Sequence, residues 1–370
     1  MPETTTTHLV SRAELRDRAT AGGWDDPDDI AAITESKRAA LLANPLSDGD
    51  DEPVRIIGTL GDRVIGRMDL LAGTIEVPGG TVRCFWGSGL YVAPEYRRTL
   101  MGVTLIVTMQ RLREAAGACG VARAAYPVYR NLRYFDIAMP RYVVIRRTSP
   151  LLRRYLGVGL AAKIASRAAD SGLLLQWAGL AVRSKLAARG LRCEQTPVFP
   201  ARLEGNFRRQ STPVAMHRSA AWINWLLEHE FFDDGQHRRA LHLVYDRDDA
   251  VVAYFLIKAR LYEEPQTRWN LENLYLGSLS DWMIFDSSAV DLEDIVFMAV
   301  GALRQWEVDA VEVCVPPDVD DISLRRWGFV RAGDLHLLVW SSPQSALSRP
   351  EWRDPSLWRV RHADGDNFLS

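Results

Sequence analysis

A basic loop between a strand pattern and a helix pattern is the segment of this sequence best suited to bind an anion. A strand-forming run ends at Val92, and Arg97 and Arg98 follow before a helical pattern begins at Val103. The first main-chain N–H groups of a helix have no partner within it and carry the positive end of its dipole. Gly102 lets the main chain approach a ligand closely, because no Cβ intervenes. The segment therefore predicts a phosphate site, and a pyrophosphate suits it best.

The elements around this loop follow a mixed order. Gly87 and Gly89 interrupt the long strand pattern before the loop and predict a β-bulge. The patterns predict helices over 13–42, strands over 54–71 and 81–92, a helix over 103–116, a strand over 121–128, a short helix over 131–139 and a strand over 141–147. A meander followed by one strand–helix–strand unit indicates an α/β (α+β) fold, with a mixed, mostly antiparallel sheet flanked by helices.

The basic loop resembles the acyl-CoA motif of the GCN5-related N-acetyltransferase (GNAT) superfamily. The match runs from Val92 through Pro94-Glu95-Tyr96-Arg97 to Gly102. Leu100 stands where the family has its first glycine, and we expect it to narrow the phosphate loop.

The resemblance implies a donor site for acetyl-CoA or another acyl-CoA, bound as a co-substrate without a metal. Main-chain amides of the loop would bind the pyrophosphate, and the pantetheine arm would pair like an added strand with Tyr91 and Val92. The implied donor-binding residues are Tyr91, Val92, Arg97, Arg98, Thr99, Leu100, Met101, Gly102, Val103 and Asn131.

A second segment, residues 131–139, resembles the family's Asn-x-x-…-Tyr-x-x-x-Gly-Phe pattern. Ala138 replaces the glycine and Met139 the phenylalanine. The resemblance implies that Tyr134 protonates the leaving thiolate, since a phenol with a pKa near 10 lies within about two units of a thiol. Packing on a short helix is the alternative role of Tyr134. Asn131 would bind the pantetheine arm or cap the predicted helix.

The general base is not evident from the sequence. The strand pattern over 81–92 holds no carboxylate, because Glu76 precedes it and Glu95 follows it in the loop. We expect a structural role for Glu95. An acceptor amine of low pKa would need little help from a base.

The order of elements recurs after a period of roughly 190 residues, which indicates two copies of one plan. Arg325-Arg326-Trp327-Gly328-Phe329 resembles the Gly-Phe ending of the family motif, but Leu324 replaces the tyrosine. The loop over 285–294 carries carboxylates and no arginine, and these would repel a pyrophosphate. We therefore expect the second copy to be a degenerate, non-binding domain.

A basic segment joins the two copies. Between Arg141 and Arg192, eleven basic residues stand against one acid, Asp170. The segment predicts amphipathic helices that serve as a connector or as a docking surface for an acyl carrier protein, a cofactor phosphate or a membrane surface. The predicted organisation is a GNAT-like domain over 1–147, a basic helical linker over 148–212, a degenerate GNAT-like copy over 213–342 and a tail over 343–370.

The composition excludes several classes of protein. Of the 370 residues, 47% are hydrophobic and 25% charged, as in soluble globular chains. A net charge of -2 gives no global field for nucleic acid. The four cysteines form no CxxC pair and the seven histidines lack metal spacing, so no metal site is expected. We expect no signal peptide and no transmembrane segment, and hence a cytoplasmic location.

Taken together, the sequence predicts an acyl-CoA-dependent N-acyltransferase with tandem GNAT-like domains. Acetyl transfer to a small-molecule amine, by direct attack on the thioester, is the expected reaction. One alternative is an acyltransferase that depends on an acyl carrier protein or is associated with the cell envelope. The other is a non-catalytic ligand-binding or scaffold protein built from two decayed copies.

Overall fold

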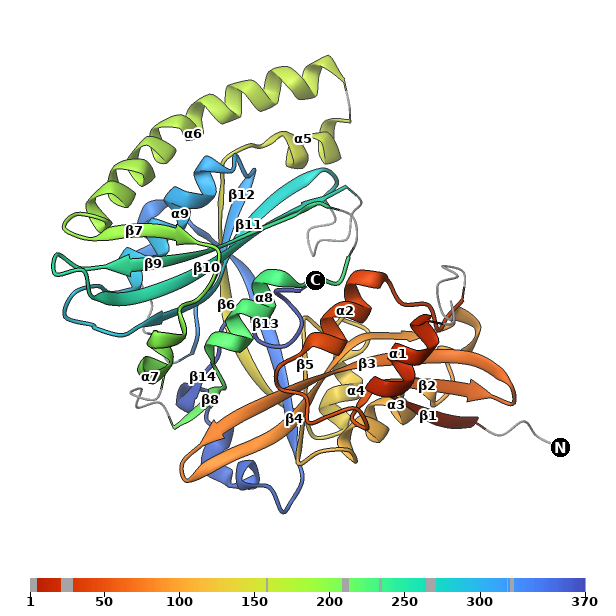
Figure 1. Cartoon of the computed structure of the whole chain (residues 1–370). Helices are drawn as coiled ribbons and strands as arrows, with labels where there is room; N and C mark the ends of the chain where they lie inside the picture. Colours follow the sequence, from red (N-terminus) through yellow and green to blue (C-terminus); the bar gives the residue numbers. More distant parts are fainter. Residues whose placement is uncertain are drawn as a thin grey trace. The chain divides into compact units, whose positions relative to one another are not determined.

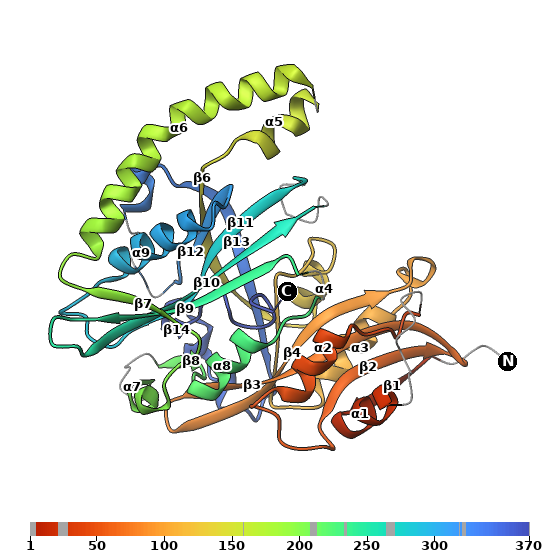
Figure 2. The same cartoon turned by 45° about the horizontal axis from the view of Figure 1, so that its top comes forward.

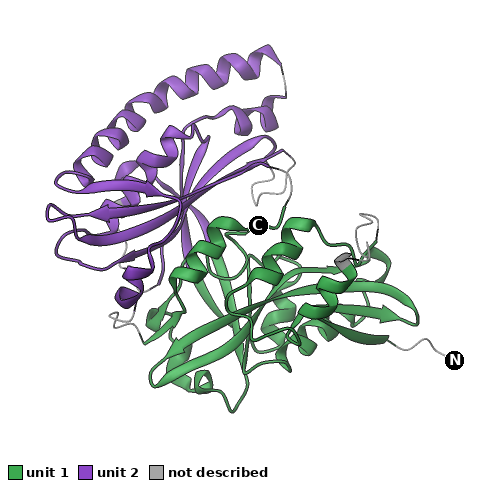
Figure 3. Ribbon diagram, viewed as in Figure 1, with its two compact units in different colours: residues 1–138, 210–233, 335–370 green, residues 139–209, 234–334 purple. Residues whose placement is uncertain are grey.

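The chain forms two compact units, shown in two colours in Figure 3. The computed structural model describes residues 5–20, 29–157, 159–207, 213–232, 235–263, 271–317, 319 and 323–369. Unit 1 comprises residues 1–138, 210–233 and 335–370, and unit 2 comprises residues 139–209 and 234–334. Each unit therefore combines distant stretches of the chain, whereas the sequence predicted the consecutive segments 1–147 and 213–342.

The sheet of unit 1 is mixed, and only its β4–β5 pair is parallel among the pairs described here. Its order is β1 (Thr5–Ser11), β2 (Pro53–Leu60), β3 (Arg63–Val77), β4 (Gly80–Val92), β5 (Ala115–Cys119) and β13 (Val330–Ser341). The short strand β8 (Val214–Met216) pairs with β3 and with β14 (Trp358–Arg359). The late strand β13 joins unit 1 because its end pairs with β5, which explains the interleaving.

Helices cover both faces of this sheet. Helix α3 (Met101–Gln110) packs on β2, β3 and β4. A Cβ at Gly58 would lie 2.2 Å from the Met101 sulfur, so a glycine lets the helix approach the strand closely. Lys37 reaches Asp69 from the opposite face. The remaining helices of unit 1 are α1 (Arg12–Thr20), α2 (Glu35–Ala43), α4 (Tyr126–Asn131) and α8 (Ala220–Glu228).

Unit 2 repeats the same plan. Its sheet has the order β6 (Phe135–Ile145), β12 (Ala310–Cys314), β11 (Leu274–Ile284), β10 (Val251–Tyr262), β9 (His237–Tyr245) and β7 (Arg192–Thr196). The pair β11–β12 is parallel, like β4–β5. The strand–helix–strand unit β11–α9–β12 thus corresponds to β4–α3–β5, and the predicted two-copy fold is confirmed.

Helices stack in two layers on one side of the unit 2 sheet. Helix α9 (Leu292–Gln305) contacts β10, β11 and β12, and the long helix α6 (Leu160–Ala187) packs on α9 (Figures 1 and 2). The short helices α5 (Ser149–Leu156) and α7 (Glu204–Phe207) flank it. The predicted basic helices are therefore present as α5 and α6. No helix among the described residues combines the length and apolar character needed to cross a bilayer.

Several predicted elements of the first copy were wrong. The helix expected over 103–116 ends at Gln110, and residues 115–119 form the buried strand β5. The segment expected as a strand over 121–128 holds the start of α4, and most of the helix expected over 131–139 is the beginning of β6. Pairing of an alanine-rich segment between β4 and β13 overrides the helix propensity of alanine.

Candidate functional site

The N-terminus of α3 presents free main-chain donors at the end of β4. In the described residues, the N–H groups of Arg98, Leu100, Gly102 and Val103 donate to no main-chain carbonyl. The hydroxyl of Thr99 accepts from the N–H of Met101 at 3.2 Å, and no acidic side chain caps the helix. Because the helix dipole places positive charge there, the four amides can receive an anion.

Two exposed arginines add formal charge beside these amides. The Nε of Arg97 donates to the carbonyl of Val92 at 3.2 Å, which anchors this guanidinium at the strand end. Arg98 is exposed to solvent. Glu95 forms an exposed ion pair with Arg63 at 2.8 Å, in line with the structural role expected for it.

The two positions that bear on the width of the loop are Gly102 and Leu100. A Cβ at Gly102 would meet only Val92, at 3.7 Å, so the protein itself does not require a glycine there. The side chain of Leu100 is 75% exposed and its φ of -79° is open to any L-residue. The expected narrowing of the loop by Leu100 is therefore wrong, because this side chain points into solvent.

Strands β4 and β5 diverge below the loop. They pair only from Cys84–Ala115 to Gly87–Ala118, whereas β4 continues to Val92. The N–H of Ala93 bonds to Ile65 on β3 at 2.9 Å, so the groups of the preceding Val92 point to the opposite edge. Among the described residues, that edge of 88–92 pairs with no strand of unit 1, and Tyr91 on it is 37% exposed. This edge can accept an extended ligand as an added strand.

A β-bulge lies on this free part of β4. The register with β3 shifts between Arg67 and Asp69, and Gly89 has a φ of +58°. The predicted bulge is confirmed. A Cβ at Gly89 would lie 2.9 Å from Nζ of Lys37, whose ammonium pairs with Asp69 at 2.6 Å. Burial alone would raise the pKa of Asp69, but Arg55 and Lys37 lower it to about 2.

A carboxylate absent from the sequence prediction lies where the two strands part. The hydroxyl of Ser88, the first β4 residue past the pairing with β5, donates to Asp366 at 2.6 Å. The neighbouring Asn367 donates to the sulfur of Cys119 at 2.6 Å, at the end of β5. Asp366 also helps to raise the pKa of Tyr129, after the larger effect of burial. Glu76, the other acid considered from the sequence, hydrogen-bonds His217 at 2.9 Å.

Tyr134 occupies a helix end rather than a helix. The N–H of Tyr134 donates to the carbonyl of Tyr129 at 3.1 Å, and Arg133 between them has a φ of +66°. This is a Schellman end of α4, with its usual contact between the two flanking side chains. Tyr134 is 2% exposed, and burial raises its pKa well above the usual value. Asn131 is the exposed last residue of α4, so it cannot cap the predicted helix.

Unit 2 contains the same helix end. The N–H of Phe329 donates to the carbonyl of Leu324 at 3.2 Å, and Gly328 has a φ of +83°. The three positions Leu324, Gly328 and Phe329 therefore correspond to Tyr129, Arg133 and Tyr134.

The helix of the second copy is closed to anions by its own side chain. The carboxylate of Asp291 accepts from the N–H of Asp294 at 2.8 Å and so caps α9. Glu293 and Asp294 add negative charge in the first turn. These contacts agree with the expectation that the second copy does not bind a pyrophosphate.

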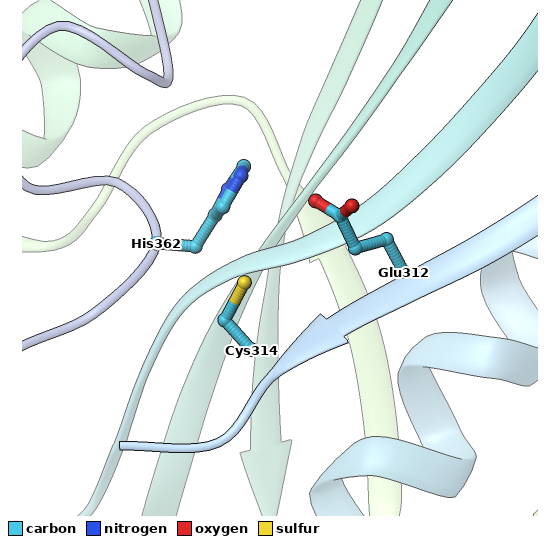
Figure 4. Close-up of side chains that lie close together, drawn as sticks. All are labelled: Glu312, Cys314 and His362. Carbon is cyan, nitrogen blue, oxygen red and sulfur yellow. The ribbon is translucent and has the colours of Figure 1, made fainter. Parts of the chain in front are cut away.

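A further acid and a thiol lie on strand β12 of unit 2. Glu312 and Cys314 both project from this strand, and His362, drawn with them in Figure 4, belongs to unit 1. Burial raises the pKa of Glu312, and Arg141 pairs with its carboxylate at 3.1 Å. A buried carboxylate paired with an arginine has an ordinary structural role.

Comparisons with solved structures give the same fold over most of the chain. Saccharomyces cerevisiae N-myristoyltransferase with bound myristoyl-CoA is similar over 92% of this chain and 79% of its own, with a TM-score of 0.53 and 13% identity. A GCN5-related N-acetyltransferase from Anabaena variabilis is similar over 91% of this chain and 72% of its own, with a TM-score of 0.51 and 12% identity. An Enterococcus faecalis protein described as a probable N-acyltransferase is similar over 91% and 73%, at 0.52 and 9%.

The chain has the GNAT fold. No protein-family model matches the sequence, and no curated protein matches it. At identities this low, the likeness concerns the GNAT fold alone.

The fold allows the second GNAT motif to be placed by its geometry. In Tyr-x-x-x-Gly-Phe, the glycine suits a left-handed residue at a helix end. Arg133 is the left-handed residue of this segment, so Tyr129 takes the tyrosine position and Tyr134 the phenylalanine position. The sequence alignment that placed Tyr134 on the tyrosine was five residues out of register, because Arg133 gives no sign of its conformation.

Proposed function

We propose that this protein is an acyl-CoA-dependent N-acyltransferase whose donor binds in unit 1. The observation that carries the proposal is the free edge of β4 over 88–92, which leads directly to the open amides of α3. Support also comes from the fold, since the similar yeast structure has myristoyl-CoA bound and the Enterococcus faecalis protein is described as a probable N-acyltransferase.

The donor-binding residues fit the parts of an acyl-CoA. The pyrophosphate would lie against the amides of residues 98–103, flanked by the guanidinium groups of Arg97 and Arg98. Thr99 and Met101 hold the turn that presents these amides. The amide-containing pantetheine arm would add to β4 beside Tyr91 and Val92, because only an extended chain with its own N–H and C=O groups satisfies a strand edge.

The bound thioester would supply an acyl group and a thiolate leaving group. Asp366 would accept one proton from the amine as the N–C bond forms and the C–S bond breaks. The hydroxyl of Tyr129 would donate its proton to the departing sulfur. Burial and the charge of Asp366 both keep this phenol protonated at neutral pH. Tyr134 is the second candidate for this acid, since its hydroxyl is buried without a hydrogen-bond partner in the described residues.

Calorimetry of acetyl-CoA binding tests the donor site. We expect Arg97→Ala combined with Arg98→Ala to weaken binding at least about tenfold, since a hydrogen bond to a charged group contributes about 1.5–3 kcal/mol. A matched pair of glycine variants sharpens the test. Gly102→Ala should weaken binding by crowding the phosphate, whereas Gly172→Ala, with nothing near its Cβ, should leave it unchanged.

The outcome that contradicts the proposal is equally direct. If acetyl-CoA, longer acyl-CoAs and free CoA all fail to bind at millimolar concentration, the chain is a non-catalytic protein with a GNAT fold. If they bind and an amine panel releases no thiol, the donor site stands and the acceptor class is wrong.

A further inference from the structure

Helices α5 and α6 of unit 2 expose an unusual amount of apolar surface. Large apolar side chains are mostly buried in folded domains, and contiguous exposed patches mark interaction sites. Eight such side chains on these helices are each at least 51% exposed: Tyr155, Leu156, Leu160, Ile164, Leu174, Leu175, Val182 and Leu186.

Helix α6 has two apolar faces, of which the protein covers one. The inner face, with Trp177 and Leu180, is buried in the core of unit 2. Leu160, Ile164, Leu175, Val182 and Leu186 recur at helical spacing on the outer side. With a rise of 1.5 Å per residue, this outer strip is about 39 Å long. We call these five residues, with Tyr155 and Leu156 on α5, the outer strip.

The charge beside the outer strip is positive. Lys163, Arg167 and Lys185 are exposed on α6, and Arg153 is exposed on α5. The one acid of these two helices, Asp170, is turned inward and accepts from the N–H and the hydroxyl of Thr148 at 2.7 and 2.8 Å. An apolar strip bordered by cations and lacking exposed acids is therefore formed.

We propose that the outer strip docks this protein on an anionic lipid surface. Apolar side chains would enter the boundary between headgroups and acyl chains, and the lysines and arginines would lie at the lipid phosphates. A second copy of this chain is a poorer occupant, because a two-fold interface would bring the same cations together. An acidic globular protein matches the charge, but its convex surface would cover only part of so long a strip.

Vesicle flotation of the full-length protein tests this proposal. The vesicles contain phosphatidylcholine alone or phosphatidylcholine with phosphatidylglycerol. We expect binding to the anionic vesicles only, with a decrease as salt is added. Ile164→Glu combined with Leu175→Glu should reduce binding at least tenfold. The control, Val198→Glu combined with Val330→Glu, makes the same changes at exposed sites outside the outer strip and should bind like the wild type.

Each other outcome overturns the proposal. Absence of binding to anionic vesicles, equal binding to neutral ones, or unchanged binding of the double variant does so. A wild-type dimer that the double variant dissociates would assign the outer strip to a second copy. Binding of an acidic acyl carrier protein in place of vesicles would assign it to that partner. Melting temperature and acetyl-CoA calorimetry check that the variants are folded, and lipid docking is independent of the proposed acyl transfer.

Discussion

The N–H of Tyr134 donates to the carbonyl of Tyr129 at 3.1 Å, and their rings meet edge to face with centroids 4.9 Å apart. One helix end therefore fixes both phenols, but it gives them different surroundings. Tyr129 senses the charge of Asp366 beside the strand divergence, whereas Tyr134 has its hydroxyl buried near Gln110.

Phenylalanine substitutions distinguish the two tyrosines. Tyr129→Phe should lower kcat by about 100-fold or more, the usual contribution of a general acid, with little change in donor affinity. Tyr134→Phe should retain kcat, and it should leave stability nearly unchanged because the lost hydroxyl has no partner in the described residues. Thiol release from acetyl-CoA with a panel of amines measures both. The opposite order of effects would assign the acid to Tyr134.

Arg133 carries a conformational cost that a glycine would remove. Its φ of +66° is unfavourable for a residue with a Cβ. Arg133→Gly should therefore raise the free energy of unfolding by up to about 1 kcal/mol. Arg130→Gly, in the helical part of α4, should lower it by about 1 kcal/mol. Urea denaturation gives both values, and loss of stability in both variants would contradict this account of the helix end.

Asp366 should matter most when the acceptor amine holds its proton tightly. Asp366→Asn should lower kcat/KM strongly for alkylamines and weakly for hydroxylamine or hydrazine, which need little base. It should also remove the acidic limb of the pH–rate profile. Ser88→Ala leaves the carboxylate in place and should retain that limb. If Asp366→Asn slows all acceptors equally at every pH, Asp366 only holds the strands.

The buried carboxylate of Asp69 makes stability depend on acidity. Its pKa of about 2 in the folded chain lies below the ordinary 3.8, so the unfolded chain binds the proton first as the pH falls. The stabilisation, about 2 kcal/mol from a shift of this size, is complete above about pH 4 and is lost as the pH falls through 2. Denaturation curves between pH 5 and 2 should show this loss. Asp69→Asn should be less stable at pH 7 and should lack this part of the slope.

The donor loop could be predicted from the sequence because its signals are local. The end of a strand, two arginines and a helix start all lie between Val92 and Val103, and the structure has the same order. The two-copy plan was also predictable, since each copy repeats the same spacing of strand and helix patterns.

Other parts depended on contacts between distant residues. The alanine-rich segment 115–119 becomes a strand only because β4 and β13 enclose it. The register of the second motif was lost because an arginine holds the left-handed position. Asp366 meets Ser88 across 278 residues of sequence, and no local pattern in the tail predicts such a contact.

The interleaving of the two units has a consequence during synthesis. β5 pairs with Leu337–Ser341, and Asp366 comes later still. A nascent chain that has reached residue 330 already contains the donor loop, but it lacks the strand that covers β5 and the carboxylate beside Ser88. Unit 1 thus reaches its final form only when the ribosome has made nearly the whole protein, and a premature stop in the last exchanged stretch leaves no autonomous module behind.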